Sequence, residues 1–179
     1  MKATGIVRRI DELGRVVIPK EIRRSLRIRE GEPLEIFTDR EGSVVFRKYS
    51  PVGEISKFSE SYAEAINRVS GIPVAVCDMD SVIAVAGVPK KEYLEKPISK
   101  ELRLILENSR AFAKEYPINK NVSLVEDGKN ISFFSPIISE GSVVGAFVSI
   151  QRGGTNNPDE TEKSLVGTGA YFISSQMEI

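Results

Sequence analysis

The sequence predicts an α+β protein of two domains, the first built from short strands and one helix, the second from an antiparallel sheet flanked by helices. Three observations support this fold class. A strand-like run, Val16-Val17-Ile18, leads through Pro19 into a short basic helix. Ser50-Pro51-Val52-Gly53 breaks the pattern and is typical of a boundary, so we expect domains at 1–50 and 51–179. Beyond the boundary, segments with strand and helix periodicity follow one another to the end of the chain.

The first half of the N-terminal domain is expected to form a strand, a turn and a helix. Residues 3–10 have the composition of a strand. The turn at 11–14 ends in Gly14, which can adopt positive φ without steric cost. Pro19 suits the first turn of a helix, where its missing N–H is not needed. On that helix Ile22 and Leu26 form one apolar stripe at i, i+4 spacing.

The second half of this domain is expected to be a hairpin. Residues 33–38 and 43–48 are strand-like and flank a turn at 39–42. A domain of about 50 residues without a disulfide or a metal has a small core and commonly depends on oligomerisation. We therefore expect this domain to associate with a second chain.

The net charge of zero hides an uneven distribution. Residues 1–29 carry a net charge of +6, residues 30–50 carry −2 and the remainder carries −4. A basic end on a neutral chain is typical of a nucleic-acid binder, whose affinity comes largely from phosphate neutralisation. The alternative is an ordinary solvated helix face. Glu21 is the one acid among residues 15–29, so the helix lacks the alternating charges of such a face.

The stretch from Lys2 to Tyr49 resembles the AbrB-type swapped-hairpin DNA-binding domain. The matching segments occur in order and at the family's spacing: Thr4-Gly5-Ile6-Val7-Arg8, Asp11-Glu12-Leu13-Gly14-Arg15-Val16-Val17-Ile18-Pro19, Glu21-Ile22-Arg23-Arg24 and Leu34-Glu35-Ile36. The resemblance implies that two chains interleave their hairpins into one β-barrel. It thus implies an obligate dimer, whose folding is inseparable from association, and double-stranded DNA as the partner.

Six residues are expected to contact the DNA. Arg8, Arg15, Arg23 and Arg24 lie where the family's DNA-contacting arginines lie, and Lys2 and Arg9 are added on charge alone. Strand alternation leaves open which of Arg8 and Arg9 points outward, because Arg8 shares its parity with apolar neighbours.

The first and last helices of the C-terminal domain carry apolar stripes. Ile55, Phe58, Tyr62, Ala65 and Val69 recur at steps of three and four, as in a coiled-coil seam. This favours an interchain bundle over packing on the same domain. In the closing helix, from about residue 158, Val166, Ala170, Ile173 and Met177 share a face that would complete a four-helix interface. The expected oligomerisation residues are Ile55, Phe58, Tyr62, Val69, Val166, Ile173 and Met177.

Between these helices the pattern indicates five strands and two helices. Strands are expected at 73–78, 82–86, 121–126, 130–139 and 143–151, and helices at about 90–95 and 100–110. This arrangement resembles a GAF-like or PAS-like sensor domain. The whole chain is similar to a family of sporulation regulators that join the two domains, which implies activation and repression of genes in the developing spore. The second domain either binds an unidentified small molecule or only holds the oligomer, expected to be a tetramer, together.

Composition argues against secreted, membrane and enzyme classes. Cys77 is the single cysteine, so no internal disulfide forms, and it is expected to be a core residue. No apolar run reaches the roughly 20 residues that span a bilayer, so a cytoplasmic location without a membrane partner is expected. Histidine is absent, which removes Ser–His and Cys–His pairs and the commonest metal ligand. Asp78 and Asp80 are expected in a turn, and no cofactor, metal or catalytic site is predicted.

An antitoxin is the alternative class, because the run Gly14 to Pro19 also occurs in antitoxins of this fold. Those proteins usually add a short disordered tail that wraps a toxin, whereas about 130 residues here show strand and helix periodicity. The sequence therefore favours a sequence-selective, DNA-binding transcriptional regulator.

Overall fold

The computed structural model describes residues 6–109, 122–153 and 158–177. The chain divides into two compact units, Met1–Tyr49 and Ser50–Ile179, which are described separately. Lys2, Asn121 and Arg110, which the sequence placed in a binding surface, a strand and a helix, lie outside the described residues.

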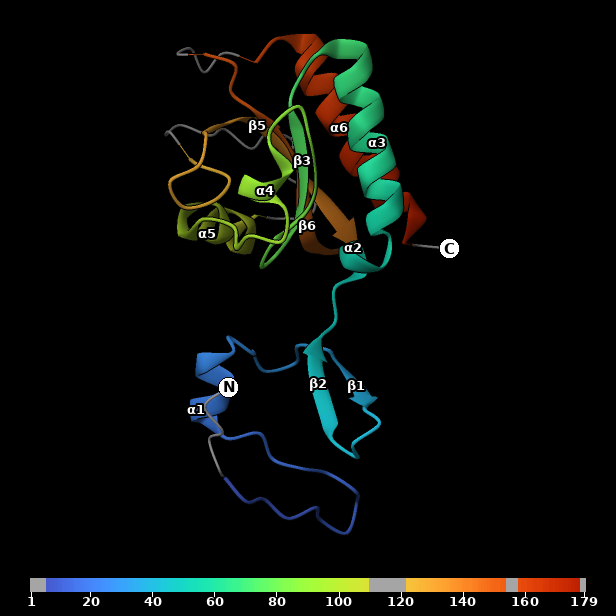
Figure 1. Cartoon of the computed structure of the whole chain (residues 1–179), viewed down its shortest axis with the longest axis vertical. Coiled ribbons are helices and arrows are strands. Elements are labelled where there is room, and N and C mark those ends of the chain that lie inside the picture. The colour runs from blue at the N-terminus through green and yellow to red at the C-terminus, as the bar shows by residue number, and fades with distance from the viewer. Residues whose placement is uncertain (1–5, 110–121, 154–157, 178–179) are drawn as a thin grey trace. The chain divides into compact units, whose positions relative to one another are not determined.

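The first unit contains one short helix and one hairpin (Figure 1). Helix α1 spans Lys20–Ser25, and strands β1 (Leu34–Thr38) and β2 (Val44–Lys48) pair antiparallel with Ile36 opposite Phe46. The predicted helix and hairpin are thus confirmed.

The other strands expected in this unit are not formed. Residues 6–10 and 16–18 lie in no strand, and the described part of the unit contains no closed barrel. The physical reason is that a strand needs a neighbour to pair its backbone N–H and C=O groups. Within the described residues, neither 6–10 nor 16–18 is paired with another strand in a backbone ladder.

The second unit is built on a four-stranded antiparallel sheet. Its elements are α2 (Pro51–Glu54), α3 (Ser56–Ser70), β3 (Val74–Asp78), β4 (Val82–Ala86), α4 (Lys90–Tyr93), α5 (Lys100–Asn108), β5 (Ile131–Ser139), β6 (Ser142–Ile150) and α6 (Glu160–Gln176). The sheet order is β4-β3-β6-β5. The predicted order of elements is confirmed with one exception. The strand expected at 121–126 is replaced by isolated bridges, in which Val125 pairs with Ile98 and Ser123 with Asn130.

Helices cover both faces of this sheet. Helices α3 and α6 lie side by side on one face, while α4 and α5 lie on the other (Figure 1). The α3/α6 face has its own core, with Val76, Ile137, Phe147 and Ile173 among its buried members. Tyr62 stacks on Phe172 with ring centroids 4.7 Å apart. The second unit therefore has two apolar layers, one on each side of the sheet.

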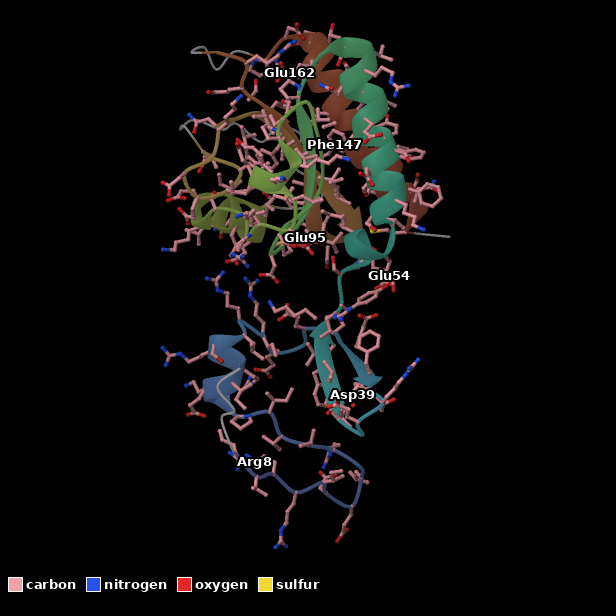
Figure 2. The ribbon with its side chains drawn as sticks, viewed as in Figure 1. Arg8, Asp39, Glu54, Glu95, Phe147 and Glu162 are labelled. Carbon is pink, nitrogen blue, oxygen red and sulfur yellow. The ribbon has the colours of Figure 1, made fainter. Side chains whose placement is uncertain are left out.

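Polar side chains fix both ends of the α3/α6 layer. The Ser149 hydroxyl donates to Glu162 Oε1 (2.6 Å), which joins β6 to the first turn of α6; Figure 2 shows Glu162 at that end of the helix. At the start of the unit, the Ser50 hydroxyl donates to Asp78 Oδ2 (2.8 Å) and accepts from the Gly53 N–H (3.0 Å). Ser50 is thereby the N-cap of α2 and ties it to the β3–β4 turn.

Candidate nucleic-acid interface

Helix α1 presents the basic residues of the first unit. Pro19 is buried and precedes the helix, as its fixed φ allows. The helix ends in a Schellman-type cap, in which the Ile28 N–H donates to the Arg23 carbonyl (2.7 Å) and Arg27 adopts a φ of 55°. Arg24 is exposed and Arg23 is half-buried. The cap thus keeps these two guanidinium groups on one short, defined turn of helix.

Most of the predicted DNA-contacting arginines lack an acidic partner. Arg8 and Arg9 are exposed on the extended segment before the first turn, where Figure 2 labels Arg8. Within the residues that the structure describes, Arg8, Arg9, Arg23 and Arg24 form no ion pair. Their charges are therefore not neutralised by neighbours and remain available to a polyanion.

Arg15 differs from the other four arginines because it is held by Asp11. Its Nε–H donates to Asp11 Oδ2 (2.8 Å), and its backbone N–H donates to Asp11 Oδ1 (2.9 Å). The Leu13 N–H donates to the same Oδ1 atom (3.0 Å). These hydrogen bonds, above all the one from the Arg15 backbone, lower the pKa of the Asp11 carboxyl below its usual value. The sequence placed Asp11 in the turn but did not predict its bond to the Arg15 side chain.

Two of the three basic residues of the hairpin are engaged within their own unit, while Arg40 in the turn is exposed. Lys48 Nζ lies 3.2 Å from Glu32 Oε1, and the Arg47 guanidinium lies 5.0 Å from the centroid of the Phe37 ring. The free positive charge of the described first unit is therefore concentrated before β1 rather than on the hairpin.

The same unit leaves its apolar side chains in solvent. Pro19 is the one buried residue among residues 6–49. The exposed large apolar residues are Ile6, Val7, Ile10, Leu13, Val16, Val17, Leu26, Ile36, Phe37, Val44, Val45 and Phe46. A monomeric soluble domain does not normally expose this many in about 45 residues.

The predicted oligomerisation residues of the second unit fall into two groups. Phe58 (56% exposed) and Val69 (88% exposed) face solvent on α3, and Ile55, Tyr62 and Met177 are half-buried at the edge of the core. Val166 and Ile173 are fully buried against the sheet. The prediction that these two face a partner is therefore wrong, because the face of α6 that carries them is already covered by its own unit.

On α3 the predicted seam and the face that packs on the sheet are different stripes. The residues that α3 packs on its sheet are Ser59, Ala63 and Ile66. The small side chains at the first two positions let the helix approach closely. The predicted seam lies beside this inner face, and Tyr171 (77% exposed) of α6 adds to the exposed apolar surface.

Other reactive side chains have structural surroundings. Cys77 is buried, and burial raises the pKa of its thiol to about 12, which suits the core role expected for it. Asp78 Oδ1 accepts the N–H groups of Asp80 and Ser81 (both 2.7 Å), as expected of a turn former, and Asp80 pairs with Arg103.

In the described ranges no three acidic or cysteine side chains are grouped to hold a metal. None of the helices there is long and apolar enough to cross a bilayer.

Comparison with known proteins shows the family to which the chain belongs. Residues 54–178 match the family described as "Stage V sporulation protein T C-terminal, transcription factor". The chain is also 47% identical over 179 residues to stage V sporulation protein T of Bacillus subtilis (strain 168), across 99% of both chains. The chain belongs to the stage V sporulation protein T family. That family's description as a transcription factor confirms the class of protein predicted from the sequence.

Three further likenesses concern parts of this family member. Residues 7–54 match a family described as "Antidote-toxin recognition MazE, bacterial antitoxin". A stretch of 62 residues is 53% identical to the transition state regulatory protein AbrB of Bacillus subtilis (strain 168), covering 31% of this chain and 64% of that one. A crystal structure of residues 122 to 287 of a methyl-accepting chemotaxis protein resembles this fold with a TM-score of 0.45 and 15% identity, over 71% of this chain and 89% of that chain. The near full-length relationship to a sporulation protein favours the regulator over the antitoxin.

Proposed function

We propose that this member of the stage V sporulation protein T family is a non-enzymatic regulator that binds double-stranded DNA and activates or represses sporulation genes in the cytoplasm. The observation that carries the proposal is a set of cations in the first unit that form no ion pair with any described residue: the exposed Arg8, Arg9 and Arg24 and the half-buried Arg23. Arg15 and Lys2 complete the proposed contact residues. The phosphates of DNA attract such a basic surface at any DNA sequence, whereas contacts to base edges let the protein select among DNA sequences.

The DNA-binding unit of the proposal is a dimer formed by hairpin exchange. The dimer is supported by the lack of an apolar core in residues 6–49, where apolar side chains are exposed on both faces of the β1–β2 hairpin. An isolated two-stranded hairpin is marginal in water. A second copy whose strands pair with residues 6–10 and 16–18 would bury these side chains and place two sets of arginines on one barrel.

A second contact, through α3 and α6, would join two such dimers into a tetramer. Phe58, Val69 and Tyr171 are exposed on these helices, and each apolar side chain of this size gains about 1.5–3 kcal/mol when it is buried. Two DNA-binding dimers in one particle would gain avidity on one DNA. The role we assign to the second unit is thus assembly, with Ile55, Tyr62 and Met177 at the rim of the contact.

The DNA interface is tested with Arg8→Ala and Arg24→Ala in the full chain. Each should weaken binding to duplex DNA and reduce the slope of log affinity against log salt by about 0.9 for each phosphate that is no longer neutralised. Arg152→Ala, which removes an exposed cation from the second unit, is the matched control and should change neither quantity. Unchanged affinity and slope in Arg8→Ala and Arg24→Ala, with native circular dichroism, would remove this surface from the function.

The assembly is tested by light scattering. Phe58→Glu combined with Val69→Glu should reduce the full chain from a tetramer to a dimer, because a charge is unfavourable in a buried apolar contact. Leu104→Glu alters a similarly exposed apolar residue on α5, outside the proposed contact, and should leave the mass unchanged. A tetramer that survives the double substitution would contradict the α3/α6 contact.

A further inference from the structure

The first unit contains the same turn twice. In residues 11–15, Asp11 Oδ1 accepts the N–H groups of Leu13 (3.0 Å) and Arg15 (2.9 Å). In residues 39–43, Asp39 Oδ1 accepts those of Glu41 (2.9 Å) and Ser43 (2.8 Å); Figure 2 labels Asp39 at the hairpin turn.

The remaining backbone geometry of the two turns also agrees. In each, the aspartate N–H bonds to the carbonyl four residues on, and the glycine N–H bonds to the aspartate carbonyl. Gly14 and Gly42 hold φ values of 74° and 84°, which favour glycine. The aspartate and the glycine three residues later therefore build the same turn in both places.

The two turns differ in the residue after the glycine. Position 43 is a serine, whereas position 15 is an arginine whose Nε–H donates to the second carboxylate oxygen of Asp11 (2.8 Å). The side chain of Arg15 remains 69% exposed. In the described part of the chain its two terminal nitrogens have no hydrogen-bond partner. Asp11 thus does more than form a turn: it also fixes one edge of the Arg15 guanidinium and leaves the opposite end open.

A guanidinium held in this way is suited to reading a base. The two terminal nitrogens of arginine donate in parallel and match the O6 and N7 acceptors of guanine. Holding the side chain in advance reduces the rotamer entropy that binding removes. A neighbouring carboxylate also repels phosphate oxygens, which makes this arginine a weaker general phosphate binder than the unpaired Arg8 or Arg24.

We propose that Asp11 is a positioning residue that directs Arg15 to a guanine edge, so that the Asp11–Arg15 pair supplies sequence discrimination while the unpaired arginines supply general affinity. This inference rests on the proposed DNA-binding function. Asp11 is a member of the interface through Arg15 and needs no contact with DNA of its own.

The experiment compares two duplexes with the full-length protein. One is selected from a random-sequence library by the wild-type chain, and the other is an unselected duplex of the same length and base composition. Asp11→Asn retains an oxygen for the turn N–H groups but replaces the oxygen that accepts from Arg15 Nε. Its affinity for the selected duplex should fall about 5- to 100-fold, the range for one bidentate base contact. Its affinity for the unselected duplex should stay the same or rise, because a negative charge has been removed.

Asp39→Asn is the matched control, because it makes the same change in a turn without an arginine. In Asp39→Asn, the ratio of the affinity for the selected duplex to that for the unselected duplex should equal the wild-type ratio. In an Arg15→Ala background, Asp11→Asn should change the ratio no further, since the two residues act as one unit. Equal loss on both duplexes, or the same loss of ratio in Asp39→Asn, would overturn the inference and leave Asp11 a turn former.

Failure of this inference can be distinguished from failure of the proposed function. If the wild-type chain binds neither duplex, the DNA-binding proposal fails. A second outcome would be that the wild-type chain prefers the selected duplex and that Arg24→Ala weakens this binding. If Asp11→Asn then leaves the ratio of the affinities for the two duplexes unchanged, only the assignment of Asp11 fails.

Discussion

Among the described residues, the second unit buries 29 hydrophobic side chains and exposes four large ones, whereas the first unit buries Pro19 alone and exposes twelve. Both units contain β-strands with apolar side chains, but they differ in how many elements surround those strands. The second unit has four strands in one sheet with helices on both faces, and every strand face has a cover. The first unit has two paired strands and six helical residues, too few to form layers.

This contrast connects stability to function. A unit that completes its core within one chain can fold first and serve as a fixed base for assembly. A unit that lacks a core folds only when its partner arrives, so its DNA-binding surface would exist only in the oligomer. In the proposed function, the arginines of one chain are therefore presented to DNA together with those of another.

The largest effect is expected from a charge in the hairpin of the first unit. Ile36→Asp or Phe46→Asp places a carboxylate in the cross-strand pair that a second chain should bury. We expect loss of the N-terminal unfolding transition and of DNA binding, while the C-terminal transition stays at the wild-type temperature. Calorimetry and DNA titration measure the two effects. Arg40→Asp, in the turn of the same hairpin, is the control and should retain the N-terminal transition. A retained transition in Ile36→Asp would mean that the first unit needs no second chain.

The next effect is expected from the core of the second unit. Phe147 is fully buried, meets the edge of the Tyr62 ring at 6.1 Å between centroids, and lies between the sheet and the α3/α6 pair in Figure 2. Phe147→Ala should cost about 3–5 kcal/mol in the free energy of unfolding of this unit, because apolar burial is reduced and a cavity is left. Denaturant titration gives the value. Phe58→Ala, on the exposed side of α3, should cost much less in the monomeric unit, and equal losses would contradict the assignment of inner and outer faces.

Substitutions at two glycines of α6 perturb the packing of α6 on the sheet less than Phe147→Ala does. A Cβ at position 169 would lie 2.9 Å from ring atoms of Phe147, whereas one at position 167 would meet no atom within 4 Å. Gly169→Ala should therefore destabilise the second unit by about 1–3 kcal/mol, as overpacking does. Gly167→Ala should stabilise it by about 0.5–1 kcal/mol, because alanine loses less entropy in a helix. The opposite order of melting temperatures would show that α6 sits further from the sheet than described.

The comparison also explains which features could be predicted from the sequence. Strands β3, β4, β5 and β6 and the hairpin were readable because their turns and periods are local. The faces of α3 and α6 were less readable, because both helices carry apolar residues beyond the stripe that meets the sheet. Ser59 and Ala63 are too small or too polar to stand out as core positions, yet with Ile66 they form the inner face of α3.

For the candidate site, charge and family resemblance identified the arginines but not their partners. Arg8, Arg23 and Arg24 stand out as cations in the sequence, and their lack of an ion pair in the described residues agrees with that interpretation. The Asp11–Arg15 pair depends on a side chain reaching back across a turn. The sequence shows the Asp-x-x-Gly pattern at both 11–14 and 39–42, but it does not show that the arginine after the first turn bonds back to its aspartate.

An effect of similar, small size concerns the residue where the two units meet in the sequence. Ser50 begins the second unit, where its hydroxyl caps α2 and donates to Asp78. Ser50→Ala removes both hydrogen bonds and should cost about 1 kcal/mol, the usual loss for an N-cap serine. Because both partners belong to the second unit, only the C-terminal transition should move in calorimetry. Ser50→Thr keeps a hydroxyl and should restore most of the loss. A shift of the N-terminal transition in Ser50→Ala would show that the folding of the two units is coupled through this residue, and the contrast between an independent and a dependent unit would then no longer hold.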